Sequence, residues 1–403
     1  MIENKYFKKT ILGLIPDEWG IDKIGNIFYI KTGKTNVQDS TQDGKYPLFD
    51  RSTRLKKSSK YLFDSEAIIV PGEGKEFIPR YFDGKFDLHQ RAYALIPKDR
   101  NINVKFFYYW IYLDRAYLEK VSVGSTVKSL RLEHFYNFPL PLPSRKEQDS
   151  ISVILSCLDS KIELNEKMNK TLEAIAQAIF KHWFIDFEFP DEDGKPYKSS
   201  GGEMIDSELG KIPKGWTIGT LGDHIVFIKG KKSIELQQNE NLKLIPIISM
   251  EMLENGECKF GVPMKMKIAN KYDPIMVMDG ASSGRIEIGF EGIIGSTFAS
   301  ITPNDNILSS FYLFGLLKYL EKVLRENTTG TSIPHADKKR IKKIQFLIPI
   351  KQIILKFDDM ERAIIDKLSF NRNEVKNLIL IRDSLLPKLM TGKIRVPMED
   401  EHE

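Results

Sequence analysis

Two stretches of this sequence decide its fold: residues 151–183, ISVILSCLDSKIELNEKMNKTLEAIAQAIFKHW, and residues 357–389, FDDMERAIIDKLSFNRNEVKNLILIRDSLLPKL. In each stretch apolar side chains recur every three or four residues, which places them on one face of an α-helix. Helices of this length with so narrow an apolar stripe are typical of coiled coils. The two stretches therefore predict two long helices that pack against each other along this stripe.

The predicted seam has matching positions in the two helices, 206 residues apart. They are Ile154, Leu158, Ile162, Asn165 and Leu172 in the first helix and Met360, Ile364, Leu368, Asn371 and Leu378 in the second. Asn165 and Asn371 are equivalent and lie near the helix centres, so we expect them to face each other if the helices are antiparallel. A buried Asn pair costs stability but fixes register and orientation. The alternative is two solvated asparagines on an imperfect stripe.

The repeat extends outward from the helices over most of the chain. Ile15-Pro16-x-x-Trp19 with Gly25 and Gly33 returns 197 residues later as Ile212-Pro213-x-x-Trp216 with Gly222 and Gly230. Gly124-Ser125-Thr126-Val127 returns 206 residues later as Gly330-Thr331-Ser332-Ile333. Internal repeats of this kind define the architecture. The chain is therefore a duplicated unit.

Outside the helices, short β-type runs such as 67–70, 93–96 and 275–278 alternate with turn residues. Each copy also carries a short helical pattern, at 104–120 and 309–326. We therefore predict an α+β protein: two pseudo-symmetric α+β domains joined by two long antiparallel helices that form a coiled coil. The expected bounds are a first domain at 1–143, a helix at 144–189, a linker at 190–211, a second domain at 212–348, a helix at 349–390 and a C-terminal tail at 391–403.

Local signals support these bounds. Ser144-x-x-Glu147 is a capping box at the start of the first helix. The acidic, Gly- and Ser-rich composition of 190–202 is typical of a linker. Pro387 and Gly392 are expected to end the second helix.

The composition and motifs favour no catalytic chemistry. The net charge is only +5, so the charge alone does not indicate a nucleic-acid partner. The two cysteines are far apart, which favours a reducing compartment, and no apolar run reaches the roughly 18 residues of a membrane span. We therefore expect a cytoplasmic protein without a membrane segment. The string Pro71–Lys75 ends like a phosphate-binding loop but lacks its first glycine. The acidic string 190–195 lies in the predicted linker, and no histidine or cysteine pair has the spacing of a zinc site. We expect no catalytic residue, no cofactor and no metal.

Loops rich in Lys, Arg, Ser, Gln and Gly remain, and such residues bind DNA phosphates and base edges. The candidate DNA contacts in the first copy are Lys31, Lys34, Arg51, Arg54, Lys56, Lys57, Lys75, Arg80, His89, Gln90, Arg91, Ser125 and Lys128. Those in the second copy are Lys231, Lys232, Ser282, Ser283, Arg285, Thr297, Thr331, Ser332 and His335. For any one of them the alternative is a solvated surface side chain. The loops occur in both copies while their residues differ, as expected for two domains that recognise different sequences.

Three strings resemble the specificity subunits of type I restriction-modification enzymes: Lys181–Glu188 (KHWFIDFE), Glu208–Trp216 (ELGKIPKGW) and Leu385–Ile394 (LLPKLMTGKI). The resemblance covers essentially the whole chain. It implies two target recognition domains, each reading one half of a split, asymmetric site in double-stranded DNA. It also implies that the two helices set the spacing of these domains and dock two methylation subunits.

The resemblance further implies that S-adenosylmethionine is bound by the methylation subunit, and that restriction subunits can join the complex. We expect partners to use the outer faces of the helices, with Trp183 and Phe184 at one end. Two other functions stay open: a coiled-coil scaffold that binds no nucleic acid, and a nuclease that acts alone.

Overall fold

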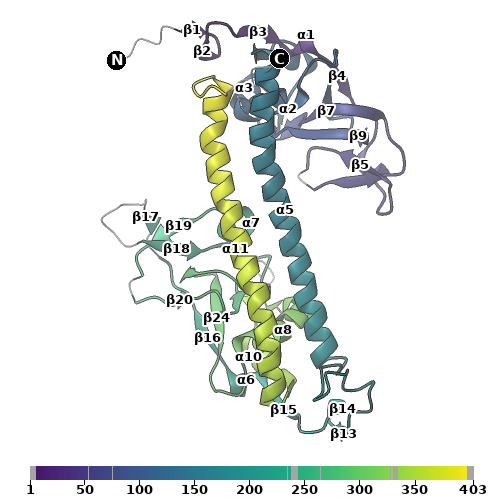
Figure 1. Ribbon diagram of the computed structural model, residues 1–403, viewed down its shortest axis with the longest axis vertical. Coiled ribbons are helices and arrows are strands. Elements are labelled where there is room, and N and C mark those ends of the chain that lie inside the picture. Colours follow the sequence, from purple (N-terminus) through teal and green to yellow (C-terminus); the bar gives the residue numbers. More distant parts are fainter. Residues whose placement is uncertain are drawn as a thin grey trace, which may run out of the picture. The chain divides into compact units, whose positions relative to one another are not determined.

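The structure is a computed structural model and describes residues 6–52, 54–74, 76–233, 235–236, 244–263, 265–326, 328–329 and 335–396. The chain divides into two compact units, unit 1 (Met1–Ile162 with Asn377–Glu403) and unit 2 (Glu163–Lys376). Two long helices, α5 (Arg145–Phe184) and α11 (Lys351–Met390), each contribute residues to both units (Figure 1). No helix in the described ranges is both long and apolar enough to cross a membrane.

Unit 1 is built on one main sheet. Its strand order is β4 (Phe28–Thr32), β10 (Ala92–Pro97), β7 (Phe63–Pro71), β9 (Arg80–Leu88), β5 (Tyr46–Phe49) and β6 (Lys56–Ser58). Neighbouring strands are antiparallel except β5 and β9, which are parallel. The other elements are the strand pairs β1 (Phe7–Thr10) with β2 (Gly13–Pro16), β3 (Gly20–Lys23) with β12 (Pro139–Leu142) and β8 (Glu73–Gly74) with β11 (Lys128–Ser129), the 3-10 turn η1 (Val37–Asp39), and the helices α1 (Ile24–Ile27), α2 (Val104–Leu113), α3 (Arg115–Val121) and α4 (Leu132–Tyr136).

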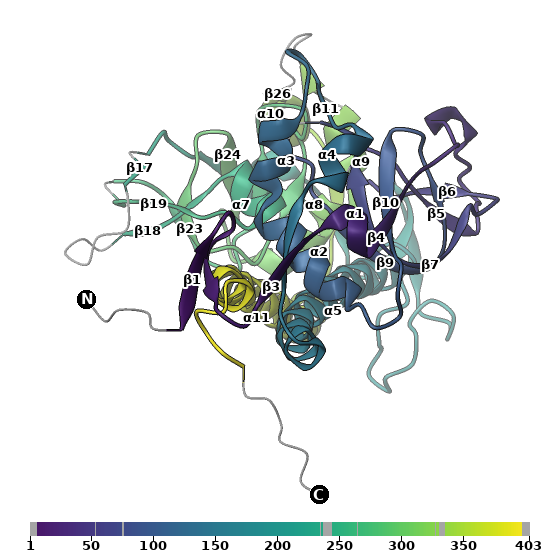
Figure 2. The same cartoon turned by 90° about the horizontal axis from the view of Figure 1, so that it is seen from above.

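Unit 2 repeats the plan with smaller sheets. One has the order β16 (Ile225–Lys229), β24 (Phe298–Pro303), β21 (Ile275–Val277) and β22 (Ile286–Glu287). The other has the order β17 (Glu235–Leu236), β19 (Lys259–Gly261), β18 (Ile245–Ile248), β23 (Gly292–Ile294) and β20 (Ile268–Ala269). The first four of these strands are labelled in Figure 2. The remaining elements are the pairs β13 (Met204–Ser207) with β14 (Gly210–Pro213), β15 (Thr217–Thr220) with β27 (Gln345–Ile348) and β25 (Thr328–Thr329) with β26 (His335–Ala336), and the helices α6 (Leu221–His224), α7 (Met250–Asn255), α8 (Ser310–Tyr319), α9 (Glu321–Glu326) and α10 (Lys338–Lys342).

The α+β class predicted from the sequence is confirmed. The runs at 67–70 and 93–96 lie in β7 and β10, and the run at 275–278 contains β21. The predicted helices at 104–120 and 309–326 are each broken into two, α2 with α3 and α8 with α9. The break at Asp114 occurs where the backbone leaves the helical region, with φ −98° and ψ 26°.

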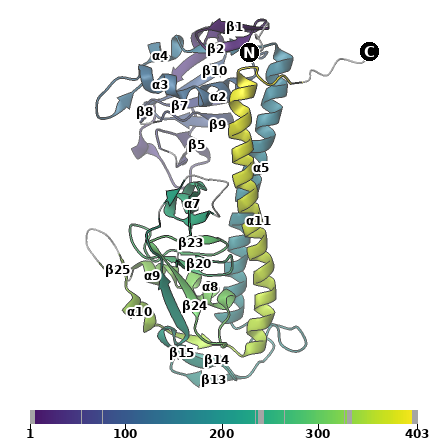
Figure 3. The ribbon, with the colours of Figure 1, turned by 90° about the vertical axis from the view of Figure 1, so that its left-hand side faces the viewer.

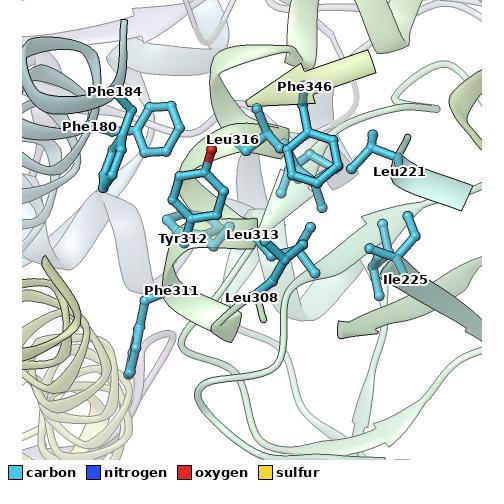
Figure 4. Close-up of a cluster of buried hydrophobic side chains, with 14 of the residues drawn as sticks. Phe180, Phe184, Leu221, Ile225, Leu308, Phe311, Tyr312, Leu313, Leu316 and Phe346 are labelled. Carbon is cyan, nitrogen blue, oxygen red and sulfur yellow. The ribbon is translucent and has the colours of Figure 1, made fainter. Parts of the chain in front are cut away.

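The last turn of α5 belongs to the core of unit 2. Trp183 is 9% exposed and Phe184 is 2% exposed, and both join the apolar cluster around Tyr312 of α8. Figure 4 shows Phe180 and Phe184 beside Tyr312, and the ring centroids of Phe184 and Tyr312 are 4.8 Å apart. The prediction that Trp183 and Phe184 offer an exposed docking surface is therefore wrong, because both rings are used to fill this core.

The last turn of α11 plays the same part in unit 1. Leu389 and Met390 lie 206 residues after Trp183 and Phe184, and they pack in the cluster that contains Trp19. Pro387 does not end the helix as predicted, because α11 continues through it to Met390. Gly392 follows with a φ of 69°, a conformation that suits the residue after a helix end.

Within unit 2 the segments of α5 and α11 run side by side (Figures 1 and 3) and are antiparallel. The Nδ2 of Asn165 donates to Oε2 of Glu374 over 2.8 Å, and the Nδ2 of Asn371 donates to Oδ1 of Asn169 over 2.9 Å. In unit 1, Arg382 of α11 donates to Asp159 of α5 over 2.9 Å.

The two asparagines are buried, with Asn165 at 1% and Asn371 at 0% exposure, so they are not solvated. They do not bond to each other as a facing pair would, because the Oδ1 atom of each accepts no hydrogen bond in the described part of the chain. Each instead bonds to a residue near the other asparagine, Asn371 to Asn169 and Asn165 to Glu374. The predicted direct pairing is corrected to two offset bonds. Among the other predicted seam residues, Ile162 and Leu368 are buried and the rest are half-buried.

The segment predicted as a linker is folded. It contains the hairpin of β13 and β14, and the rings of Phe189 and Tyr197 stack 4.6 Å apart. Phe189 also stacks on Trp216 at 5.3 Å. The composition of 190–202 misled the prediction because it does not reveal that the one aromatic residue of this range, Tyr197, packs on the core of unit 2 through Phe189.

The capping box at the start of α5 is only half formed. The amide of Glu147 donates to Oγ of Ser144 over 3.3 Å. The carboxylate of Glu147 accepts instead from Nε1 of Trp19 over 2.9 Å and from Nε of Arg395 over 3.0 Å.

The repeated glycines mark a close backbone contact in both units. A Cβ on Gly33 would lie 1.8 Å from the carbonyl oxygen of Leu88, and one on Gly230 would lie 2.1 Å from that of Gly295. No side chain fits at these distances. The contact fixes the end of β4 in unit 1 and of β16 in unit 2, where the predicted DNA-binding loops begin.

Candidate nucleic-acid interface

Backbone hydrogen bonds hold the predicted DNA-binding loops of unit 1 against one another. The amide of His89 donates to the carbonyl of Phe49 over 2.9 Å, and the amide of Gly72 donates to that of Arg91 over 2.8 Å. The amide of Leu130 donates to the carbonyl of Gly72 over 2.8 Å. Loops from four parts of the sequence therefore meet at one place.

A buried carboxyl group, that of Asp87, ties two more segments to this place. Asp87 is 1% exposed and accepts from Oγ1 of Thr35 over 2.8 Å and from Oγ of Ser58 over 2.7 Å. A buried polar group requires such partners, because it has lost those it had in water. The segment after β4 and the strand β6 are thereby fixed to the end of β9.

Asp50 is a second buried anchor, at 3% exposure. Burial alone would raise its pKa, but hydrogen bonds from Lys56 and Ser52 outweigh burial and hold the pKa below its ordinary value. Lys56 is half-buried in this ion pair, whereas the neighbouring Lys57 is exposed. Lys56 therefore orders the loop, and Lys57 is the one of the two that is open to an anionic partner.

Glu73 joins two exposed arginines. Its carboxylate lies 3.0 Å from Nη1 of Arg51 and 2.8 Å from Nη1 of Arg91. The side chain of Glu73 is 16% exposed, against 57% for Arg51 and 56% for Arg91. The acid lies mostly below the surface while both guanidinium groups face solvent.

Unit 2 contains a similar group. The carboxylate of Asp279 lies 3.0 Å from Nζ of Lys229 and 2.8 Å from Nδ1 of His335. Burial would raise the pKa of Asp279, but the bonds from His335 and Lys229 outweigh it and lower the pKa. Two exposed lysines, Lys231 and Lys232, follow Lys229 in the sequence. The exposed Thr297 directly precedes β24, the strand that pairs with β16.

The predicted contacts fall into four groups. Those exposed are Lys31, Lys34, Arg51, Arg54, Lys57, Gln90, Arg91, Ser125, Lys128, Lys231, Lys232, Thr297 and His335. Lys56, Arg80, Ser282 and Arg285 are half-buried, and His89 and Ser283 are buried. Lys75, Thr331 and Ser332 lie outside the described residues.

The two buried residues are corrected from DNA contacts to structural groups. Nδ1 of His89 accepts from the amide of Arg91 over 3.0 Å, and Oγ of Ser283 donates to the carbonyl of Met278 over 2.9 Å. Two half-buried arginines are also engaged: Arg80 donates to the carbonyl of Ser52, and Arg285 pairs with Glu287 at 2.7 Å. These side chains shape the loops rather than extend from them.

The sequence analysis missed Glu73 and Asp279, because a search for cationic and amide side chains passes over acids. A signal was present, since these two acids are related by the offset of 206 that also relates the two helices. Applying this offset to Glu73 would have identified Asp279 as its equivalent.

Known proteins are similar to this chain in sequence and in fold. Residues 16–174 and 213–376 match the family described as the type I restriction modification DNA specificity domain. The chain is 29% identical to the type I restriction enzyme MjaIX specificity subunit of Methanocaldococcus jannaschii, over 97% of this chain and 96% of that protein. It is 24% identical to the HindI specificity subunit of Haemophilus influenzae, over 81% and 85% of the two chains.

A solved structure agrees with the fold. The crystal structure of the type I restriction-modification S subunit from M. genitalium matches with a TM-score of 0.64 and 21% identity, over 92% of this chain and 96% of that one. The two segments that match the family together cover most of both copies of the repeat. This chain therefore belongs to the family of type I restriction-modification DNA specificity proteins.

Proposed function

We propose that this chain is the DNA-recognition subunit of a type I restriction-modification complex, and that each unit reads one half of a split site. The observation that carries the proposal is a repeated surface, in which exposed basic side chains surround one half-buried acid in each unit. The names of the relatives, all specificity subunits, support the same function.

The two surfaces favour an asymmetric site because their chemistry differs. Unit 1 presents the guanidinium groups of Arg51 and Arg91, and unit 2 presents the ammonium of Lys229 and the imidazole of His335. A guanidinium can donate two parallel hydrogen bonds to one guanine edge, whereas an ammonium acts as a point charge. Two unlike sets on one scaffold suit two different half-sites.

The outer faces of α5 and α11 are the proposed docking surface for two methylation subunits. Leu164 is 53% exposed and its equivalent Phe370 is 58% exposed; Ile175 is 44% exposed and its equivalent Ile381 is 48% exposed. Residues eleven apart lie three helical turns apart on one face. Each helix thus carries an exposed apolar pair at equivalent positions, which favours two copies of one partner.

In this proposal the chain itself catalyses nothing, and the methylation subunits supply S-adenosylmethionine and the methyl transfer. Restriction subunits join the same complex. The two helices act as a spacer between the DNA-reading surfaces.

The test has two parts. The full-length chain should shift a mixture of duplexes in a mobility assay, and the shift should weaken steeply with salt because cations release counterions from phosphates. With its methylation subunits it should then direct methylation to a split, asymmetric motif when modified bases are mapped in the host genome. Binding that is absent at low salt would favour a scaffold, and metal-dependent cleavage by the chain alone would favour a nuclease.

A further inference from the structure

We propose that Glu73 and Asp279 are positioning residues, which hold the basic side chains of their own unit in the orientation that selects the bases of its half-site. The inference rests on the proposed function and assigns the basis of discrimination to two acids. Neither acid need touch DNA.

The backbone shows that the two acids occupy one position of the duplicated fold. Ser129 pairs with Glu73 in an antiparallel ladder, and His335, 206 residues after Ser129, pairs in the same way with Asp279. The next amide also bonds alike in both units, Leu130 to the carbonyl of Gly72 over 2.8 Å and Ala336 to that of Met278 over 2.9 Å.

The basic side chains around the acids do not follow the repeat. In unit 1 they come from the segment after β5 and from the turn between β9 and β10, as Arg51 and Arg91. In unit 2 they come from the end of β16 and from β26, as Lys229 and His335. The acid is thus the constant part of the arrangement, and the basic side chains that it holds are the variable part.

Stability is too small a benefit to explain this arrangement. Ion pairs whose cations are about half exposed contribute on the order of 0 to 1 kcal/mol, because water and salt screen them. Fixing the orientation of an arginine side chain, which otherwise loses roughly 2 kcal/mol of rotamer entropy on binding, is a larger effect. The acid orders the side chain before DNA arrives.

The geometry leaves the cations able to bind. Each arginine uses its Nη1 for Glu73, and a guanidinium has five N–H donors in all. The carboxylate also lowers the charge of the Arg51, Arg91 and Glu73 group to +1, which weakens its general attraction to phosphates. Directional bonds to base edges then contribute a larger share of the binding.

The experiment measures base preference in each half-site separately. The full-length chain and the variants Glu73→Gln and Asp279→Asn are each bound to a pool of randomised duplexes, and the bound fraction is sequenced. We expect E73Q to lose about 5-fold to 150-fold of its discrimination in one half-site only. This corresponds to the one to three kcal/mol expected for a well-placed base contact. D279N should do the same in the other half-site.

Two controls separate positioning from folding. Glu133→Gln removes an exposed acid of α4 in unit 1, paired with Arg131, and should leave both half-sites unchanged. Glu73→Asp keeps the charge and should retain most of the discrimination. Affinity for non-specific duplex should stay the same or rise in E73Q, because a negative charge near DNA is removed; a merely misfolded loop would lower it together with the thermal midpoint.

The outcomes distinguish the two proposals. If the unmodified chain discriminates and both E73Q and D279N discriminate equally well, the positioning inference is overturned and the proposed function stands. If either variant weakens both half-sites alike, the inference is also overturned. If the unmodified chain has no sequence preference, the proposed function fails and the inference with it.

Discussion

Replacing Glu361 by Gln is expected to make the protein more stable than the unmodified chain at alkaline pH. Glu361 lies in α11 at 1% exposure, and its Oε2 accepts no hydrogen bond from any described residue. It lines a small cavity with Phe314, Gly315 and Leu368. Burial, and then the charge of Asp358, raise the pKa of Glu361 to about 7 from an ordinary value of 4.5.

The sign follows from which state holds the proton more tightly. The folded protein keeps the Glu361 proton up to a pKa of about 7, whereas the unfolded chain releases it near 4.5. The free energy of unfolding therefore falls as the pH rises through this window. At about 1.4 kcal/mol per pKa unit, the loss between pH 5 and pH 8 is roughly 2 to 3 kcal/mol. Glutamine has the same shape and carries no charge, so E361Q avoids this loss.

The assay is urea unfolding of the full-length chain at pH 5, 6, 7 and 8, followed by circular dichroism. Burial also raises the pKa of Asp358 to about 6, and that group remains in both proteins. The difference between them therefore reports the burial of Glu361 together with its repulsion from Asp358. Glu166→Gln, at an exposed position of α5, is the matched control and should show no such difference. Equal pH profiles for E361Q and the unmodified chain would refute the raised pKa of this buried carboxyl group.

Three further predictions concern the backbone, the charged surface and the helices. Gly33→Ala should destabilise unit 1 by several kcal/mol, because its Cβ would lie 1.8 Å from a carbonyl oxygen. Gly20→Ala is the control, because the nearest atom to its Cβ would be 3.4 Å away. Similar thermal midpoints for the two variants would contradict the close backbone contact at Gly33. Replacing the exposed Lys34 and Lys57 together by Ala should reduce the slope of the logarithm of the DNA-binding constant against the logarithm of the salt concentration by about 2. The reason is that each phosphate the protein no longer neutralises removes roughly 0.9 from the slope. An unchanged slope would exclude both lysines from the DNA surface. Inserting four residues into both α5 and α11 should add about 6 Å and lengthen the unread spacer of the target by one or two base pairs; a spacer of unchanged length would mean that the helices do not set it.

The sequence predicted the parts of the structure that follow from periodicity and repetition. The α+β class, the antiparallel association of the helix segments and the strands at β7, β10 and β21 all follow from such patterns. Repetition also located the glycines at 33 and 230, whose close backbone contacts the structure then explained.

Features that depend on which face of an element finds a partner were not predictable in this way. Trp183 continues the stripe of α5 and Phe184 follows it, but the sequence does not reveal that the domain core covers both. Asn165 and Asn371 were placed on the seam, yet a shift of a few residues along the helices gave each a different partner. Glu73 and the arginines that it holds meet only in the folded chain.

The most direct test of the central claim, that the two units read separate half-sites, is a domain exchange. Residues 1–143 would be replaced by the corresponding domain of another family member, and the target of the full complex would be determined by mapping methylated bases. We predict that one half of the motif changes while the other half and the spacer length stay the same. A motif that changes in both halves, or in neither, would contradict the account.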